Sequence, residues 1–163
     1  MSSTEDIEMA YWEEYAGEEN GLWHDVLVGE DIEIAVLTED DADRLFALTD
    51  SNRTYLRQWL PWVDDTRNVE DTRAFIASSL RRYRDDVGMS CGILYQGNLA
   101  GVIGFNTIDW MNFKTEIGYW LGADFQGLGL ITRACRAMID HAFLDLELNK
   151  VEIRCATDGC RPC

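Results

Sequence analysis

Lysine is scarce in this sequence: only Lys114 and Lys150 occur in 163 residues, and residues 1–31 contain neither lysine nor arginine. Asp and Glu number 30 against 14 Lys and Arg, which gives a formal net charge of −16. A surface this acidic disfavours nucleic acid as a partner, because nucleic acid is itself a polyanion. Two explanations of the charge stay open: adaptation to a salt-rich cytoplasm, where molar salt shortens the Debye length to ~3 Å, or a solvated acidic face with an acidic tail.

Long hydrophobic runs are also missing. No stretch approaches the ~18 consecutive apolar residues of a membrane-spanning helix, and the amino terminus carries acidic residues where a signal peptide carries basic ones. We therefore expect a cytoplasmic protein without a membrane partner. The length and the hydrophobic content of 47% are typical of one globular domain. We place this domain at residues 31–163, behind an acidic extension at residues 1–30.

The five cysteines and two histidines form no metal or disulfide pattern. An odd number of cysteines without an export signal argues against a disulfide framework. Cys160 and Cys163 form a Cys-x-x-Cys pair, but no second pair accompanies it, so we expect no metal site. His24 and His141 are isolated in the sequence and are interpreted as structural or solvent-facing. The other three cysteines are interpreted as small buried hydrophobic residues: Cys91, Cys135 and Cys155.

The hydrophobic periodicity predicts an α+β domain. Thr38 and Asp41 form a plausible capping pair for a first helix, a second helix ends at Pro61, and Asn68 precedes a third helix that runs to about Gly88. A hairpin and a strand–helix–strand crossover follow, with the ligand crevice expected beside the crossover. The expected strands are residues 32–36, 89–95, 99–108, 115–121 and 150–155, and the crossover helix is residues 128–144.

A glycine-rich turn joins the strand ending at Leu121 to the crossover helix. The first N–H groups of a helix have no intrahelical partner and carry partial positive charge, so they attract anions. Gly127 and Gly129 let a phosphate approach this backbone without a Cβ in the way. The spacing lacks the third glycine of a dinucleotide-binding fold and the Gly-Lys-Ser/Thr of a P-loop. The turn therefore predicts a phosphate-bearing ligand of another class.

The segment Gln126-x-x-Gly129-x-Ile131 resembles the pyrophosphate loop of the GNAT superfamily of acetyl-CoA-dependent N-acetyltransferases. Other segments resemble, in the family's order, the subgroup that acetylates the N-termini of ribosomal proteins: residues 52–64, 97–105, 116–121 and 146–151. Together the matches cover about residues 32–158. The resemblance implies a mixed, mainly antiparallel sheet flanked by helices, with acetyl-CoA as cosubstrate and a protein N-terminus or small amine as acceptor.

The resemblance also implies a set of cofactor-binding residues. The pantetheine arm is expected along the backbone of Tyr119, Trp120, Leu121 and Gly122, and the N–H of Leu121 is expected to polarise the thioester carbonyl. The pyrophosphate is expected at the turn and the first helical residues: Gln126, Gly127, Leu128, Gly129, Leu130 and Ile131. Two of these residues depart from the family pattern, since Leu128 stands where Lys or Arg is common and Ile131 where Gly or Ala is frequent.

The acceptor amine must lose a proton before it attacks a thioester. At pH 7 roughly a tenth of α-amino groups are neutral, whereas the neutral fraction of lysine side chains is below about one in a thousand. An N-terminal amine therefore needs only a modest base. We expect Glu116 to be this base, acting through a water. A solvent-facing carboxylate or a cross-strand ion-pair partner is the alternative for Glu116. The resemblance implies that Trp59, Pro61 and Trp62 lie near the acceptor groove. The alternative, that Trp59 is a core residue and Pro61 only ends a helix, is slightly favoured.

The end of the sequence also departs from the family. After Asp158 the family continues with a helix and two strands, whereas this sequence reads Gly159-Cys160-Arg161-Pro162-Cys163. We expect a truncated or frameshifted product that lacks the last helix and strands. Its last strand is then an exposed edge that favours a homodimer. Two functions stay open, an N-acetyltransferase and a catalytically impaired acyl-CoA-binding or partner-pairing fragment.

Overall fold

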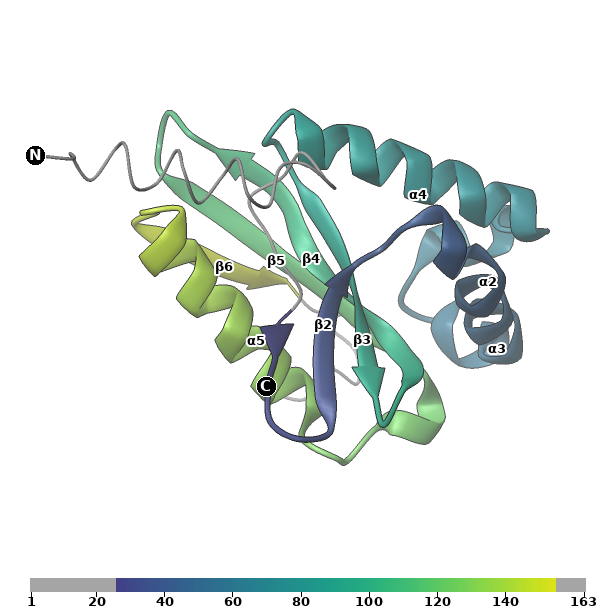
Figure 1. The fold of residues 1–163 in the computed structure, drawn as a ribbon. Coiled ribbons are helices and arrows are strands. Elements are labelled where there is room, and N and C mark those ends of the chain that lie inside the picture. Colours follow the sequence, from purple (N-terminus) through teal and green to yellow (C-terminus); the bar gives the residue numbers. More distant parts are fainter. Residues whose placement is uncertain (1–25, 155–163) are drawn as a thin grey trace, which may run out of the picture.

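The computed structural model describes residues 26–154, and the hypotheses on His24, Cys155, Cys160, Cys163 and most of the acidic extension lie outside this range. The described chain forms a six-stranded sheet in the order β1-β2-β3-β4-β5-β6 (Figure 1). All neighbouring pairs are antiparallel except β5 and β6, which are parallel. The strands are β1 (Val26–Leu27), β2 (Ile32–Val36), β3 (Met89–Tyr95), β4 (Asn98–Asp109), β5 (Lys114–Leu121) and β6 (Lys150–Arg154).

Helices cover both faces of the sheet. In Figure 1, α2, α3 and α4 lie on one side and α5 lies on the other. Residues of α5 such as Met138 share a buried cluster with Phe105 and Ile117 of the sheet. The opposite face packs Val102 against α2 and α4 in a second cluster. The helices are η1 (Glu39–Asp41), α2 (Ala42–Ser51), α3 (Arg53–Leu56), η2 (Pro61–Asp65), α4 (Val69–Arg84), η3 (Ala123–Phe125), α5 (Leu130–Asp140) and the π-helical turn η4 (His141–Asp145).

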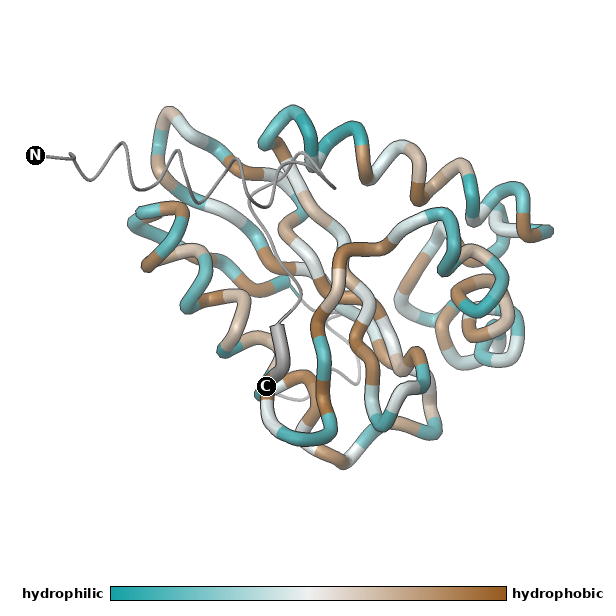
Figure 2. The backbone as a smooth tube through the Cα atoms, in the orientation of Figure 1, coloured by the Kyte–Doolittle hydropathy of each residue, from teal (hydrophilic) through white to brown (hydrophobic). Residues whose placement is uncertain are grey.

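The strands follow the alternation of the sequence. In β2 the side chains of Ile32, Ile34 and Val36 are buried and the residues between them are less so. Figure 2 shows hydrophobic segments concentrated along the central strands. Gln96 and Gly97 both have positive φ, at 50° and 81°, in the turn between β3 and β4, where the sequence predicted a hairpin. This is the backbone twist that two-residue hairpin turns need. The mixed, mainly antiparallel sheet confirms the predicted fold class.

Two predicted helix starts are confirmed by their caps. The backbone N–H of Thr38 donates to Asp41 Oδ2 over 2.8 Å at the start of η1, which leads into α2. Asn68 caps α4, because its Oδ1 accepts the N–H of Asp71 over 3.0 Å. Each bond satisfies a helix-end or cap N–H that would otherwise lack a partner. The chain therefore enters the helical layer at the two places that the sequence indicated.

Three element boundaries differ from the predictions. The sequence suggested that structure starts near Asp31, but β1 precedes this residue and pairs with β2. Strand β1 was missed because a strand of two residues is too short to show a periodic pattern. The second helix ends at Leu56 and not at Pro61, since Leu60 before the proline is extended, with φ −118° and ψ 102°. The crossover helix begins at Leu130 and not at Leu128, because Gly129 has a left-handed φ of 73°.

Candidate functional site

The turn after β5 presents an open helix N-terminus. Gly127 and Gly129 have φ of 79° and 73°, and a Cβ added to either would meet no atom within 4 Å. Gly129 is the N-cap of α5, and no side chain caps the helix there. Leu130 is buried and anchors the first turn in the core, whereas Gln126, Gly127, Leu128 and Gly129 are exposed. Because the turn before α5 is exposed and no side chain caps the helix, this helix end has the geometry of an anion site.

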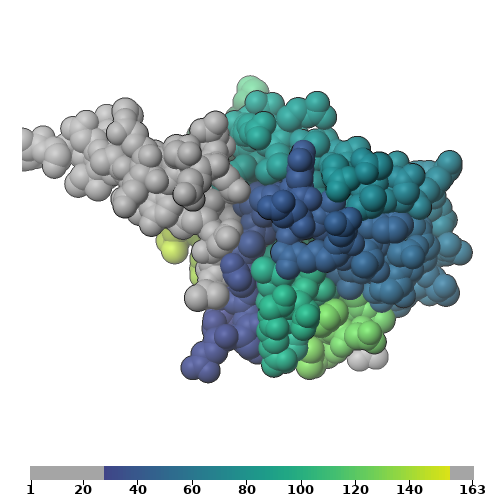
Figure 3. Space-filling view, turned by 45° about the vertical axis from the view of Figure 1, so that its right-hand side comes forward, coloured from purple at the N-terminus to yellow at the C-terminus, as the bar shows by residue number. Residues whose placement is uncertain are grey.

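Helix α3 holds this turn at two points. The N–H of Ala123 donates to Asn52 Oδ1 over 2.9 Å, and the side-chain amide of Gln126 donates to the Tyr55 hydroxyl. Gly122 packs closely against α2, since a Cβ there would lie 2.9 Å from Leu48 Cδ1. The segment after β5 also lies beside the β3–β4 hairpin, as Figure 3 shows in light green and green. No local sequence signal indicates the two hydrogen bonds to this turn, because the partners in each are 71 positions apart.

Strand β5 extends beyond its last described pair with β6. The register runs from Lys114 opposite Lys150 to Gly118 opposite Arg154, which is the last described residue. Strand β5 continues to Leu121, and on its other side Trp120 and Leu121 pair with β4. The predicted pantetheine segment, from Tyr119 to Gly122, is thus the part of β5 that lies past its last described pair with β6.

A cavity of about 500 Å³ lies beside this end of β5. Three small residues line it in register across the sheet, with Ser90 opposite Gly104 and Gly104 opposite Gly118, and Arg154 lies opposite Gly118 on the next strand. A Cβ at Gly104 would clash with the Met89 carbonyl oxygen and one at Gly118 would lie 2.7 Å from Asn106 Oδ1, so neighbouring atoms already occupy the space beside both glycines. Sequence reasoning missed this alignment, since residues in three separate strands come into line only once the register is known. The lining residues are Tyr55, Trp59, Leu60, Trp62, Phe75, Arg82, Ser90, Val102, Gly104, Phe105, Asn106, Gly118, Tyr119, Trp120, Leu121 and Arg154.

Aromatic side chains form one wall of the cavity. Trp59 and Trp62 line it together with Trp120 of β5, and the rings of Trp62 and Trp120 are 6.0 Å apart between centroids. Trp59 is only partly buried, so its interpretation as a core residue is wrong. Pro61 is exposed and is not among the lining residues. It is the first residue of η2. Proline fits this position because the N–H that it lacks would have no partner within the helix. The aromatic motif that the sequence singled out therefore reaches the cavity through its two tryptophans.

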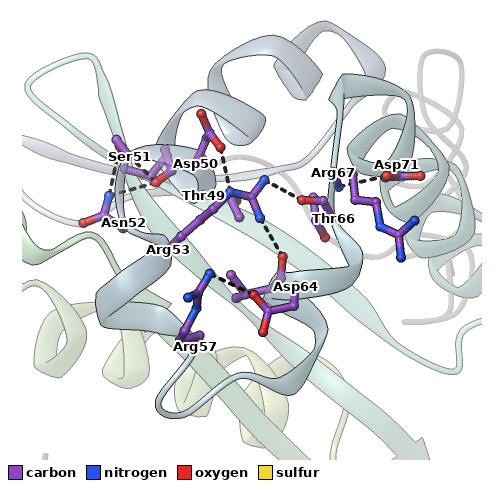
Figure 4. A network of polar contacts seen from close by, with 12 residues as sticks. Thr49, Asp50, Ser51, Asn52, Arg53, Arg57, Asp64, Thr66, Arg67 and Asp71 are labelled. Carbon is purple, nitrogen blue, oxygen red and sulfur yellow. Dashed lines mark hydrogen bonds and ion pairs between the residues drawn. The ribbon is translucent and has the colours of Figure 1, made fainter.

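Arg53 fixes the position of η2, which carries Trp62. Its guanidinium donates to the backbone oxygens of Val63, over 2.8 Å, and Thr66, and Nε pairs with Asp50 over 2.6 Å (Figure 4). A second ion pair of 3.0 Å joins Arg57 and Asp64 in the same network. Because Arg53 satisfies one carbonyl of η2 and that of its C-cap, Thr66, it holds the wall of the cavity against α3.

Glu116 lies at the edge of the cavity. Its carboxylate accepts a 2.8 Å hydrogen bond from Asn106 Nδ2 at Oε1 and pairs with Arg154 Nη2 over 3.3 Å at Oε2. Asn106 and Arg154 are lining residues and Glu116 itself is not, so the carboxylate faces the cavity through its two partners. The ion pair with the neighbouring strand was the alternative considered for Glu116. Glu116 therefore has an ion-pair partner on the neighbouring strand and also lies beside the cavity.

The remaining candidate residues are structural within the described chain. Cys91 and Cys135 are buried, as predicted. His141 is buried too, with its ring stacked on Phe105 and Nδ1 2.7 Å from Asp145 Oδ2. From residue 26 to 154, no three His, Cys, Asp or Glu side chains gather as a metal site. None of the helices in that part of the chain has the length and apolar content that crossing a bilayer requires.

Residues 31–159 match the family model described as an acetyltransferase (GNAT) domain. The chain therefore belongs to the GNAT family of acetyltransferases. This confirms the resemblance inferred from the glycine turn and the segments around it, and it confirms the enzyme class.

Two relatives whose names describe ribosomal acetyltransferases align with most of this chain. The ribosomal-protein-serine acetyltransferase of Escherichia coli (strain K12) is 33% identical over 134 residues, which are 82% of this chain and 75% of the relative. YdaF of Bacillus subtilis (strain 168) is 42% identical over 133 residues, 81% of this chain and 72% of the relative.

Solved structures of two acetyltransferases share the fold. RimL, the ribosomal L7/L12 alpha-N-protein acetyltransferase, in complex with coenzyme A, has a TM-score of 0.80 at 26% identity, covering 83% of this chain and 77% of that chain. The microcin C7 self-immunity acetyltransferase MccE, in complex with acetyl-CoA and AMP, has a TM-score of 0.78 at 30% identity, covering 86% of this chain and 76% of that chain.

Proposed function

We propose that this chain transfers the acetyl group of acetyl-CoA to an amine, and that the acceptor is a protein N-terminal α-amino group such as that of a ribosomal protein. The observation that carries the proposal is the uncapped N-terminus of α5, which follows the stretch of β5 that lines the cavity. The two positive-φ glycines with free space around them fit a pyrophosphate. The names of the relatives support the acceptor class.

Acetyl-CoA supplies the acetyl group as a thioester. We propose that the exposed turn from Gln126 to Gly129, with the N–H groups of Leu130 and Ile131, holds the pyrophosphate. The backbone from Tyr119 to Gly122 then directs the pantetheine toward the cavity. In this arrangement the N–H of Leu121 faces the developing negative charge on the thioester oxygen and stabilises it.

Glu116 removes the proton of the acceptor. The nitrogen lone pair forms the new bond to the acetyl carbon, and the amine proton passes through a water to the carboxylate. The bond from that carbon to sulfur breaks, its electron pair stays on sulfur, and coenzyme A leaves as a thiolate that takes a proton from solvent. Roughly a tenth of an α-amine is already neutral at pH 7, so a carboxylate suffices as base. The aromatic wall around Trp59 and Trp62 gives the first side chain of the acceptor an apolar surface.

Mass spectrometry of short peptides incubated with acetyl-CoA tests this proposal. We expect acetylation of a free serine N-terminus and none of the same peptide with a blocked N-terminus and an internal lysine. Glu116→Gln lowers the rate by about 100-fold. Glu152→Gln is the matched control, since Glu152 is the cross-strand neighbour of Glu116 and pairs with Lys150. Coenzyme A binding without product from the free N-terminus contradicts an enzymatic role and supports an acyl-CoA-binding one.

A further inference from the structure

Asn106 occupies a β-bulge next to the candidate base. Phe105 pairs with Ile117 and Thr107 pairs with Glu116, so Asn106 is the extra residue in β4. A bulged residue is left out of the sheet ladder, and its carbonyl and side chain are aimed differently from those of its neighbours. We propose that Asn106 is a positioning residue, which holds the Glu116 carboxylate for proton removal. The proposal rests on the proposed function of Glu116.

The backbone of the bulge is held from α4. Arg82 Nη2 donates to the carbonyl oxygen of Asn106 and lies 3.5 Å from Thr107 Oγ1. Arg82 reaches this carbonyl across Gly88, where a Cβ would lie 2.9 Å from the same nitrogen. The guanidinium therefore satisfies a carbonyl that the bulge removes from the ladder, and it fixes the orientation of the bulged residue.

The side chain of Asn106 is held from β5. A Cβ at Gly118 would lie 2.7 Å from Asn106 Oδ1, so the amide lies directly over this glycine. An ionised carboxylate only accepts hydrogen bonds, so the amide nitrogen must face Glu116. This is the 2.8 Å bond from Nδ2 to Oε1. The amide oxygen then lies over Gly118, which lines the cavity.

The contacts form one line from α4 to β6, from Arg82 through Asn106 and Glu116 to Arg154. Of the two partners of the carboxylate, Arg154 has a side chain that is 75% exposed, whereas Glu116 is 22% exposed. An exposed ion pair contributes little to fixing geometry. The shorter bond from the bulge therefore determines where the carboxylate lies.

The first experiment follows the Glu116 carboxyl carbon by carbon-13 NMR at pH 7, which needs no turnover. Asn106→Leu keeps a similar volume without a donor, and we expect the Glu116 carboxyl signal to move away from its position in the parent because the hydrogen bond is lost. Asn98→Leu, at the exposed start of the same strand, leaves the signal unchanged. Arg82→Gln releases the bulge and should also move the Glu116 signal, which gives a second test that leaves Asn106 itself in place.

The second experiment measures kcat and KM with a serine peptide. Asn106→Leu should lower kcat about tenfold, with an unchanged KM for acetyl-CoA. A Glu116 NMR signal in Asn106→Leu that matches the parent overturns the positioning role. No acetyl transfer by the parent overturns the proposed function instead, and the NMR result still decides whether Asn106 holds the carboxylate.

Discussion

Gly129→Asp tests the anion site at the start of α5, and the structure separates its effect on binding from its effect on folding. A Cβ at Gly129 meets no atom within 4 Å, so the new side chain causes no clash. A left-handed φ of 73° costs a residue with a Cβ about 1 kcal/mol. An acidic N-cap regains about 0.3–1 kcal/mol from the helix dipole. We therefore expect the thermal stability of the apo protein to stay close to that of the parent.

Coenzyme A binding should respond much more strongly. Two unit charges about 5 Å apart at an effective dielectric constant of about 20 repel by about 3 kcal/mol. Since about 1.4 kcal/mol is a factor of ten, the dissociation constant should rise about 100-fold. Isothermal titration calorimetry measures this at low salt, because screening at molar salt weakens the repulsion.

Gly129→Asn is the matched control for this prediction. Asparagine has the same shape as aspartate and tolerates the left-handed conformation, but it carries no charge. Its dissociation constant for coenzyme A should rise only a few-fold above the parent value. If the Asp and Asn variants bound coenzyme A within threefold of each other, the ligand phosphates would not lie at this helix end and the site assignment would fail.

Three further predictions concern other parts of the molecule. Tyr55→Phe removes the hydroxyl that accepts from Gln126 and should weaken coenzyme A binding about threefold in calorimetry; in a Gln126→Ala background it should have no further effect. The thermal midpoint should rise from dilute to molar potassium chloride, because salt screens the net charge of −16, and an unchanged or lower midpoint contradicts this. Hydrogen bonds from Asn112 hold the pKa of Asp109 below its usual range. Asp109 therefore stabilises the fold at pH values above its pKa in the unfolded chain, about 3.9. This contribution is lost as the pH falls through the lower pKa of the folded state. Asp109→Ala should thus lower the thermal midpoint at pH 7 but hardly at pH 2, and equal losses at both pH values would refute the linkage.

The glycine turn before α5 could be predicted from sequence because its signals are local. The positive φ of Gly127 and Gly129 requires residues without a Cβ, and the helix that follows shows its own periodicity. Glu116 could be placed on one strand face with Gly118 by alternation alone. The residues that bind Glu116 could not be predicted, because Asn106 reaches it only through a bulge that shifts the register of β4 by one residue.

The sequence by itself determined the order of the elements, the caps of the helices, the hairpin turn and the open glycine turn before α5. Each depends on the conformational preferences of neighbouring residues, which act at short range along the chain. Only the tertiary structure decided how α3 holds that turn through Asn52 and Tyr55. It also decided how Gly104 and Gly118 come to line one cavity. These arrangements depend on strand register and helix packing, which bring distant residues together and are set by burial across the whole domain.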